Sequence, residues 1–294
     1  MNRPILVTGI SGFIGGHVWA ALADWGNVWG THGSADRQPL NPDRQRRVDL
    51  AQPESLVDLI QELRPGCILH LAAVSNIAVC RKHSLLAWRV NNVAVRMLAK
   101  AAERIRARVI LASTDQVFDG SKGSYREGDK PNPINIYGET KKAAERSLFA
   151  TVSDAVVVRI NRVYGKPKYG GSSFSEWVLK RVEVGAPVPL YVDQFRSFID
   201  IVSLTKALVE LIDHPFRGLL HLGGANRVSR LTFGMKLLQH LGRDTSSVIG
   251  LKSALNDPEG AVPLDTSFDL TLARQVLKTR LPGIEEGIAL AYNS

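Results

Sequence analysis

Short apolar runs alternate with longer amphipathic stretches along most of the chain. Runs of this length are typical of buried strands, and the stretches between them space their apolar residues at the helical period. The expected strands are residues 5–7, 27–31, 67–71, 109–112, 155–159 and 219–222, and the expected helices are residues 15–25, 55–63, 85–105, 137–149 and 203–211. Because strands and helices alternate, the pattern predicts an α/β fold with a doubly wound parallel sheet.

The alternation loosens after residue 165. Glycine and proline interrupt it at residues 170–173 and 185–189, and two or three further helices complete the chain. We therefore expect a smaller C-terminal lobe beside the sheet domain. The expected division is a sheet domain of residues 1–165, to which residues 196–224 return, and a lobe of residues 166–195 and 225–294.

The composition supports one large globular unit or two modest ones. The 294 residues are 45% apolar, which is enough for a sizeable core. The net charge is +9 and the isoelectric point is about 9.7, so an anionic partner is expected. The basic residues are scattered without the interleaved aromatics of a single-strand binder, which favours a phosphate-rich small ligand over nucleic acid.

No apolar run approaches the roughly 18 residues of a membrane helix, and no charged-then-apolar leader opens the chain. We expect a cytoplasmic protein without a membrane partner. Cys67 and Cys80 fit neither a disulfide framework nor a zinc site and are expected to be ordinary thiols. The seven histidines show no metal-ligand spacing, so no metal is expected.

Three glycines follow the first expected strand and lead into the first expected helix. Gly9 would allow a tight turn, Gly12 a close approach of the backbone to a pyrophosphate, and Gly15 close packing of helix on strand. The amino end of the helix would then face the anion. A glycine-rich loop can exist without a ligand, but this strand-turn-helix context favours a dinucleotide site.

The residues after the second strand bear on the choice of dinucleotide. An NAD site usually has an acid there to bind the ribose 2′-hydroxyl, whereas this chain has His32 and Gly33, followed by Ser34 and Arg37. An arginine can grip a 2′-phosphate with two parallel hydrogen bonds. We therefore favour NADP(H) as the cofactor, with NAD(H) as the alternative.

Tyr137 and Lys141 are four residues apart on one face of an expected helix. Such pairs are often mere surface neighbours. An ammonium beside a phenol would, however, lower the phenol pKa from about 10 toward working pH, as a proton donor to a nascent alkoxide requires. The polar stretch of residues 113–116, directly after a buried strand, is either a turn or part of the same chemistry.

Together these motifs resemble the extended short-chain dehydrogenase/reductases, a family with a Rossmann fold. Tyr137 and Lys141 match its Tyr-x-x-x-Lys pair, and Thr114 matches the hydroxyl that binds the substrate carbonyl oxygen. Residues 49–50, 70–73 and 90–91 match further family segments beside the cofactor and active site. The resemblance implies that the catalytic residues are Thr114, Tyr137 and Lys141. It implies that the cofactor-binding residues are Gly9, Ser11, Gly12, Phe13, Ile14, His32, Ser34, Arg37, Asp49, Leu50, Leu71, Ala72, Ala73, Asn91 and Lys141.

Residues 113–120 and 192–200 are similar to segments of reductases of nucleotide-linked deoxysugars, in particular the dTDP-4-dehydrorhamnose reductases. Arg159 is expected to be a structural ion partner, and Arg196 resembles the diphosphate-binding arginine of other family members. The substrate half departs from the subgroup, because residues 261–267 lack its arginine and residues 195–198 lack its Gly and Pro-Thr. The expected substrate-binding residues are Ser113, Asp115, Gln116, Asn161 and Arg196.

The resemblance leaves three functions open. The first is an NADPH-dependent reductase of a nucleotide-linked 4-keto-6-deoxysugar, with Tyr137 as proton donor. The second is a nucleotide-sugar epimerase or dehydratase with bound NAD, but dehydratases place a glutamate where this chain has Gln116, which cannot take a proton from carbon. The third is a non-catalytic NADP-binding regulatory subunit, like the methionine adenosyltransferase beta subunit. Relatives often dimerise through helices equivalent to residues 85–105 and 137–149, so a homodimer is possible.

Overall fold

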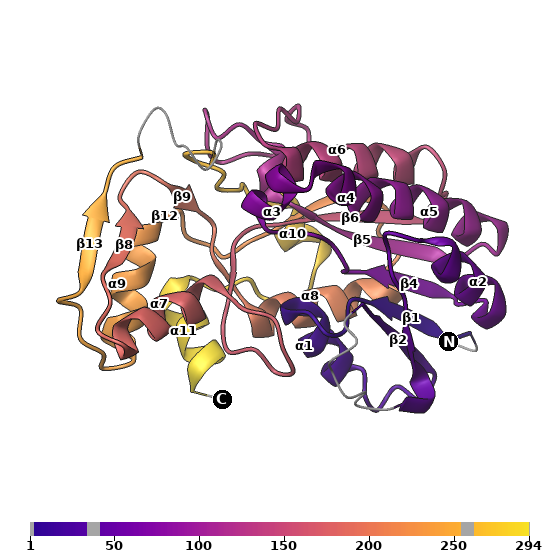
Figure 1. The fold of residues 1–294 in the computed structure, drawn as a ribbon, viewed down its shortest axis with the longest axis horizontal. Helices are drawn as coiled ribbons and strands as arrows, with labels where there is room; N and C mark the ends of the chain where they lie inside the picture. Colours follow the sequence, from indigo (N-terminus) through magenta and orange to yellow (C-terminus); the bar gives the residue numbers. More distant parts are fainter. Residues whose placement is uncertain (1–2, 34–41, 254–261, 294) are drawn as a thin grey trace.

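A seven-stranded parallel sheet forms the centre of the protein (Figure 1). The computed structural model describes residues 3–33, 42–253 and 262–293. The strand order is β11-β6-β5-β4-β1-β2-β3, which confirms the expected doubly wound fold. The strands are β1 (Ile5–Thr8), β2 (Val28–His32), β3 (Gln45–Arg47), β4 (Cys67–His70), β5 (Arg108–Thr114), β6 (Ala155–Ile160) and β11 (Gly218–Leu222).

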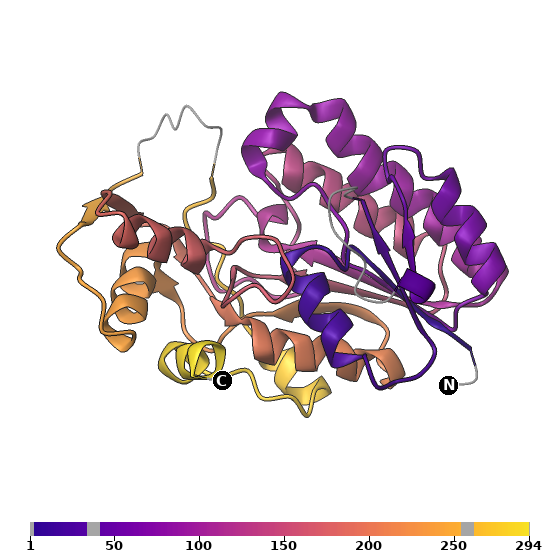
Figure 2. The same ribbon diagram turned by 60° about the horizontal axis from the view of Figure 1, so that its bottom comes forward.

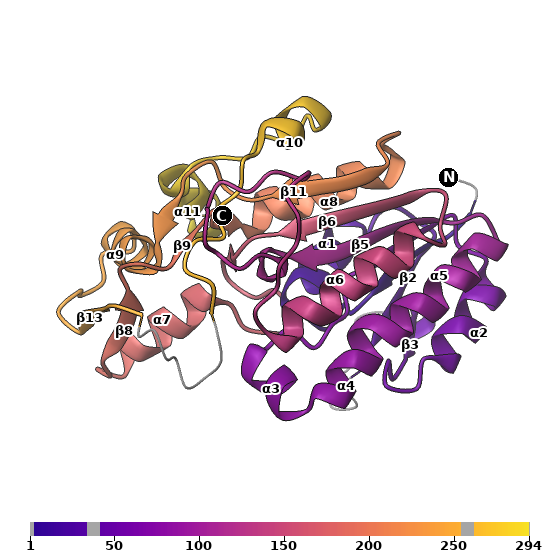
Figure 3. The ribbon, with the colours of Figure 1, turned by 90° about the horizontal axis from the view of Figure 1, so that it is seen from above.

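Helices cover both faces of this sheet, as Figure 3 shows. On one face lie α1 (Phe13–Ala21) and α8 (Ile201–Asp213), and on the other lie α2 (Glu54–Leu63), α5 (Ala94–Arg104) and α6 (Ile136–Phe149). Successive strand residues therefore enter different cores: Val7 packs on the α1 side and Leu6 on the α2 side. This two-sided burial explains why the strands read as continuous apolar runs.

The helix expected over residues 85–105 is present in three joined pieces. They are α4 (Ser84–Trp88), a π-helical turn η2 (Arg89–Val93) and α5. The π turn places Asn91 in the interior, where its side chain bonds the backbone of Val74 and the hydroxyl of Thr140. The remaining short elements of the sheet domain are η1 (Pro42–Arg44), beside β2, and α3 (Ile77–Lys82) and η3 (Asp115–Val117).

The smaller lobe packs beyond the carboxyl edge of the sheet, at the left of Figure 2. Its own core is rich in aromatic residues, with Phe198 stacked on Phe233 at a centroid distance of 4.2 Å. The lobe contains α7 (Phe174–Glu183), β8 (Val188–Tyr191), β9 (Phe195–Arg196), β12 (Val228–Ser229), α9 (Arg230–His240), β13 (Val248–Leu251) and α11 (Ile284–Tyr292).

Several segments connect the lobe with the sheet. The pair β7 (Val163–Tyr164) and β10 (Ile199–Asp200) leads into α8 and β11, which belong to the sheet core. Besides this returning segment, α10 (Thr271–Val276) packs against β11. Within the described residues no helix is long and apolar enough to cross a membrane. Cys67 and Cys80 are free thiols, as expected.

A buried ion pair anchors α6 to the sheet. Arg159 on β6 donates two hydrogen bonds to Glu145 on α6, from Nε to Oε1 at 3.0 Å and from Nη2 to Oε2 at 2.7 Å. The hydroxyl of Ser113 on β5 also donates to Glu145. Both ion-pair side chains are almost fully buried, so Arg159 is the structural ion partner that the sequence predicted.

We expect Glu145→Gln to lower the free energy of unfolding by about 3–5 kcal/mol, because it leaves the Arg159 charge buried without a counter-ion. Urea denaturation measures this change. Arg126→Gln is the matched control: its exposed pair with Asp269 should contribute less than about 1 kcal/mol. If both variants lost equally little stability, the anchoring role of Glu145 would be wrong.

Candidate functional site

A cleft of about 800 Å³ lies at the carboxyl ends of the strands, between the sheet and the lobe. Ligands bind at this edge in doubly wound folds. Most of the residues predicted for the site line it. They are Gly9, Ser11, Gly12, Phe13, Ile14, His32, Asp49, Leu50, Leu71, Ala72, Ala73, Ser113, Thr114, Asp115, Gln116, Tyr137, Lys141 and Asn161. Asn91 and Arg196 do not line it, and Ser34 and Arg37 lie outside the described residues.

The glycine turn has no room for a side chain at Gly9 or at Gly15. Gly9 has a φ of 77°, and a Cβ there would lie 2.8 Å from the Cα of Ala72. A Cβ on Gly15 would lie 2.0 Å from the carbonyl oxygen of Gly9. At these glycines the backbone approaches the cleft without a side chain, next to the amino end of α1, which suits the pyrophosphate of a dinucleotide.

Thr8 joins the ends of β1 and β4 beneath this turn. Its hydroxyl oxygen lies 2.9 Å from Nδ1 of His70 and accepts hydrogen bonds from the backbone N–H groups of Leu71 and Ala72. Burial lowers the pKa of His70 to about 3, so this ring is neutral. Leu71 and Ala72, both predicted cofactor-binding residues, are thus held at the wall of the cleft.

The structure brings Thr114 and Tyr137 together, although 22 positions separate them in the sequence. A side-chain hydrogen bond with Thr114 lowers the pKa of Tyr137, and burial raises it by more. The expectation that the Tyr137 pKa moves down toward neutrality is therefore wrong, because the net shift is upward. Tyr137 is protonated at neutral pH and can donate.

Lys141 is 2% exposed and lies one helical turn beyond Tyr137 on α6. Burial lowers its pKa to about 8, and the charge of Glu145 acts in the opposite sense. The ammonium form still predominates at neutral pH. The helix therefore holds a buried positive charge one turn from the Tyr137 phenol.

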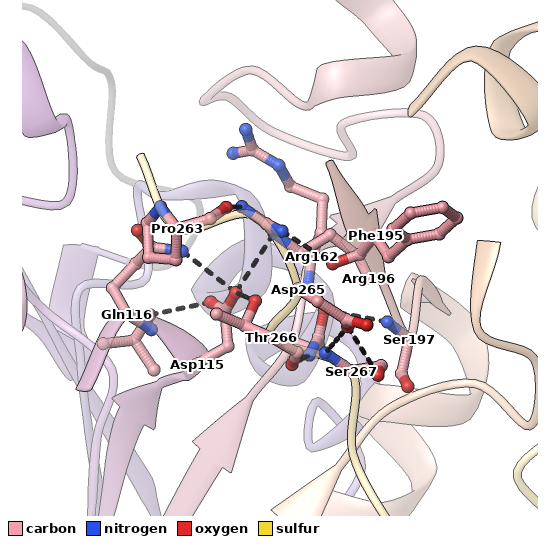
Figure 4. A network of polar contacts seen from close by, with 12 residues as sticks. Asp115, Gln116, Arg162, Phe195, Arg196, Ser197, Pro263, Asp265, Thr266 and Ser267 are labelled. Atoms are coloured by element: carbon pink, nitrogen blue, oxygen red, sulfur yellow. Dashed lines mark hydrogen bonds and ion pairs between the residues drawn. The ribbon is translucent and has the colours of Figure 1, made fainter. Parts of the chain in front are cut away.

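A hydrogen-bonded network surrounds Asp115 at the wall of the cleft (Figure 4). Its carboxylate accepts hydrogen bonds from the side chains of Thr114, Gln116 and Thr266, and lies 3.4 Å from Nε of Arg196. The bonds from Gln116 and Thr266 orient Asp115, which in turn fixes the Thr114 hydroxyl by accepting its hydrogen bond. Residues of the C-terminal lobe thereby hold the end of β5.

Arg196 belongs to this network, away from the cleft. It is 1% exposed, and its Nη atoms donate to the carbonyl oxygens of Phe195, Leu264 and Pro263. These bonds occupy the guanidinium group, so the structure does not place it where it would meet a substrate diphosphate. Asn161 does line the cleft, and its Nδ2 donates to the Thr266 carbonyl oxygen at 2.7 Å.

The sequence analysis missed several cleft residues, among them Arg162, Phe174 and Arg230. Arg162 follows the strand end that contains the predicted Asn161, so its neighbourhood was visible in the sequence. Arg230 is the first residue of α9, in a stretch without any motif. Among the described residues, no group of three His, Cys, Asp or Glu side chains could hold a metal ion.

A family model described as the RmlD substrate binding domain matches residues 1–294. The chain belongs to this family. The match confirms the resemblance to dTDP-4-dehydrorhamnose reductase-like proteins that the motifs indicated. A relative from Haloferax volcanii, named a probable low-salt glycan biosynthesis reductase, is 29% identical over 96% of this chain and 95% of its own. The methionine adenosyltransferase 2 subunit beta of Bos taurus is 29% identical over 78% of this chain and 69% of its own.

Solved structures of dTDP-4-dehydrorhamnose reductases share the fold. The hypothetical one from Sulfolobus tokodaii has a TM-score of 0.85 and 28% identity, and covers 97% of this chain and 99% of its own. The one from Bacillus anthracis, solved with NADP, has a TM-score of 0.85 and 23% identity, and covers 100% and 99%. Together with the family match, the relatives named as reductases agree with the expected enzyme class, an oxidoreductase of nucleotide sugars.

We expect Gly15→Ala to abolish measurable dinucleotide binding, because its Cβ would collide with the Gly9 carbonyl oxygen and open the turn. Fluorescence titration with NADPH measures the affinity. Gly16→Ala is the control, since a Cβ there meets only ordinary contacts, the nearest at 3.4 Å. Undiminished NADPH affinity in Gly15→Ala would contradict the placement of the cofactor at this turn.

Proposed function

We propose that the protein is an NADPH-dependent reductase of a nucleotide-linked 4-keto-6-deoxysugar, similar to dTDP-4-dehydrorhamnose reductase. The observation that carries the proposal is the convergence of Thr114, Tyr137 and Lys141 on the cleft that the glycine turn also lines. The family membership and the reductase names among the relatives support it.

Tyr137, Thr114 and Lys141 have different roles in the reduction of the substrate carbonyl group. A bound reduced nicotinamide supplies the hydride that carbonyl reduction requires. The Tyr137 hydroxyl gives its proton to the carbonyl oxygen. The Thr114 hydroxyl, which donates to Asp115 in the structure, turns to donate a hydrogen bond to that oxygen when the substrate binds. Lys141 stabilises the resulting phenolate. The protonated state of Tyr137, which burial favours, suits the direction of reduction.

Gln116 favours reduction over dehydration. Its Nε2 donates to Asp115 at 2.9 Å, and its Oε1 accepts from Asn135 at 3.2 Å, so the amide is held in place at the cleft. An amide has no basic oxygen that could remove a proton from carbon. A dehydratase would need another base at this position.

A non-catalytic NADP-binding subunit is the second candidate. It is favoured by the relatives named methionine adenosyltransferase 2 subunit beta. NADPH oxidation in the presence of dTDP- and UDP-linked 4-keto-6-deoxysugars separates the two functions. Turnover supports the reductase, whereas a complete lack of turnover together with a stable complex with a partner protein supports the subunit.

We expect Tyr137→Phe to lower turnover by about 10²- to 10⁴-fold, because only the proton donor is removed. NADPH affinity should stay the same, since the ring and Lys141 remain. Steady-state kinetics and NADPH titration of the same preparation measure the two quantities. Wild-type turnover in this variant would refute the role of Tyr137.

The charge of Lys141 predicts an alkaline limb in the pH profile. Below about pH 8 the ammonium is present in the free protein, and its proton is lost as the pH rises through that value. We expect kcat/KM for NADPH to fall above pH 8. Lys141→Arg keeps the charge to much higher pH, so its limb should move upward even if its turnover is lower. If kcat/KM of Lys141→Arg still fell near pH 8, the fall would come from the titration of a group other than Lys141.

A further inference from the structure

We propose that Arg162 and Arg230, both packed on Phe174, form the subsite that binds the diphosphate of a nucleoside-diphosphate substrate. The inference rests on the proposed function for the class of ligand. It assigns the diphosphate to two arginines that no sequence motif indicated, and it removes Arg196 from that role.

The two arginines come from different parts of the fold and meet at one ring. Arg162 follows β6, Arg230 begins α9, and Phe174 begins α7. The guanidinium carbons lie 5.3 and 5.5 Å from the centroid of the Phe174 ring, and all three residues line the cleft. Contact with one aromatic ring fixes both groups within reach of a single ligand.

Neither guanidinium group has a protein acceptor in the part of the chain that the structure describes. Nε of Arg230 is buried and has no hydrogen-bond partner. No ion pair of the described residues includes Arg162 or Arg230, whereas the Arg196 guanidinium is occupied by carbonyl oxygens and Asp115. An unpartnered buried donor carries a desolvation cost, which an anion bound in the cleft would remove.

The charged side chains around this part of the cleft include more positive than negative groups, which favours binding of an anion. Arg162, Arg196 and Arg230 act on one another, and the carboxylate that offsets them, Asp115, is already held by Arg196 and Thr266. Burial and the neighbouring positive charges lower the pKa of Arg230. Arg162 and Arg230 thus carry two positive charges that no carboxylate offsets. A diphosphate diester carries two negative charges and would balance them.

The position of the pair fits the substrate and not the cofactor. The glycine turn would bind the pyrophosphate of the cofactor at a different part of the cleft. Arg162 lies close enough to Tyr137 that its charge lowers the Tyr137 pKa, and in Figure 4 its side chain stands apart from the network around Asp115. A diphosphate bound here would leave its sugar beside Tyr137. The planar guanidinium fork is suited to paired phosphate oxygens.

The test uses protein saturated with NADP⁺, so that the cofactor cradle is occupied. Isothermal titration calorimetry with dTDP, UDP and thymidine measures binding to wild-type protein and to Arg162→Gln and Arg230→Gln. We expect both diphosphates to bind and thymidine to bind far more weakly. Each substitution should weaken dTDP and UDP by about 10- to 100-fold, the range for a hydrogen bond to a charged group. Arg230→Lys, which keeps the charge without the fork, should be intermediate.

Arg243→Gln is the matched control, because it removes one positive charge from an exposed site of the same lobe. NADP⁺ affinity shows that each variant is folded. Diphosphate affinities of Arg162→Gln and Arg230→Gln equal to that of Arg243→Gln would overturn the subsite, even if ketosugar reduction is observed. Conversely, Arg162→Gln and Arg230→Gln could lose diphosphate affinity while Arg243→Gln keeps it, which would uphold the subsite. If the wild-type protein then reduced no ketosugar, the proposed reductase would be refuted and the subsite would stand.

Discussion

The geometry of the candidate site depends on how α6 is fixed to the sheet. Glu145 on this helix binds Arg159 of β6 and Ser113 of β5, so one buried carboxylate joins three elements. Tyr137 and Lys141 project from the same helix, and Thr114 follows Ser113 directly. The ion pair therefore sets the distance between the hydroxyl of the strand and the phenol of the helix, without touching either.

A second constraint acts at the amino end of α6. A Cβ on Gly138 would lie 2.0 Å from the carbonyl oxygen of Gln116, so the helix packs directly on the segment that follows β5. Asn135 caps the helix by accepting the Gly138 N–H at 2.9 Å and also reaches Gln116. With Glu145 at one point and Gly138 at another, α6 cannot slide along the sheet, and Tyr137 is held against Thr114.

The C-terminal segment contributes to the site from the far side. Thr266 donates to Asp115, its own carbonyl oxygen accepts from Asn161, and Arg196 binds the carbonyl oxygens of Pro263 and Leu264. Residues between 67 and 151 positions apart thus meet at the cleft wall. Because the lobe and the sheet share this buried polar network, the substrate half of the cleft is built by contacts between them.

Much of this protein could be predicted from local sequence patterns. Apolar runs specified the strands of the sheet that the sequence analysis expected, and the short β3 (Gln45–Arg47) has too few apolar residues to be seen. Gly9 and Gly15 predicted the turn because only glycine fits it, and Tyr137 with Lys141 predicted a shared helix face because their spacing is that of one turn. These features depend on residues close together in the chain.

Only the tertiary structure determined which distant residues are in contact, how exposed each side chain is and how its pKa shifts. Arg196 and Arg230 are both arginines of the lobe, but the first is enclosed by carbonyl groups of residues 263–264 and the second lines the cleft. Likewise, spacing alone suggested that Lys141 lowers the Tyr137 pKa, whereas burial by the surrounding fold raises it. Exposure and charge environment arise from packing across the whole chain, and for that reason no local pattern could specify them.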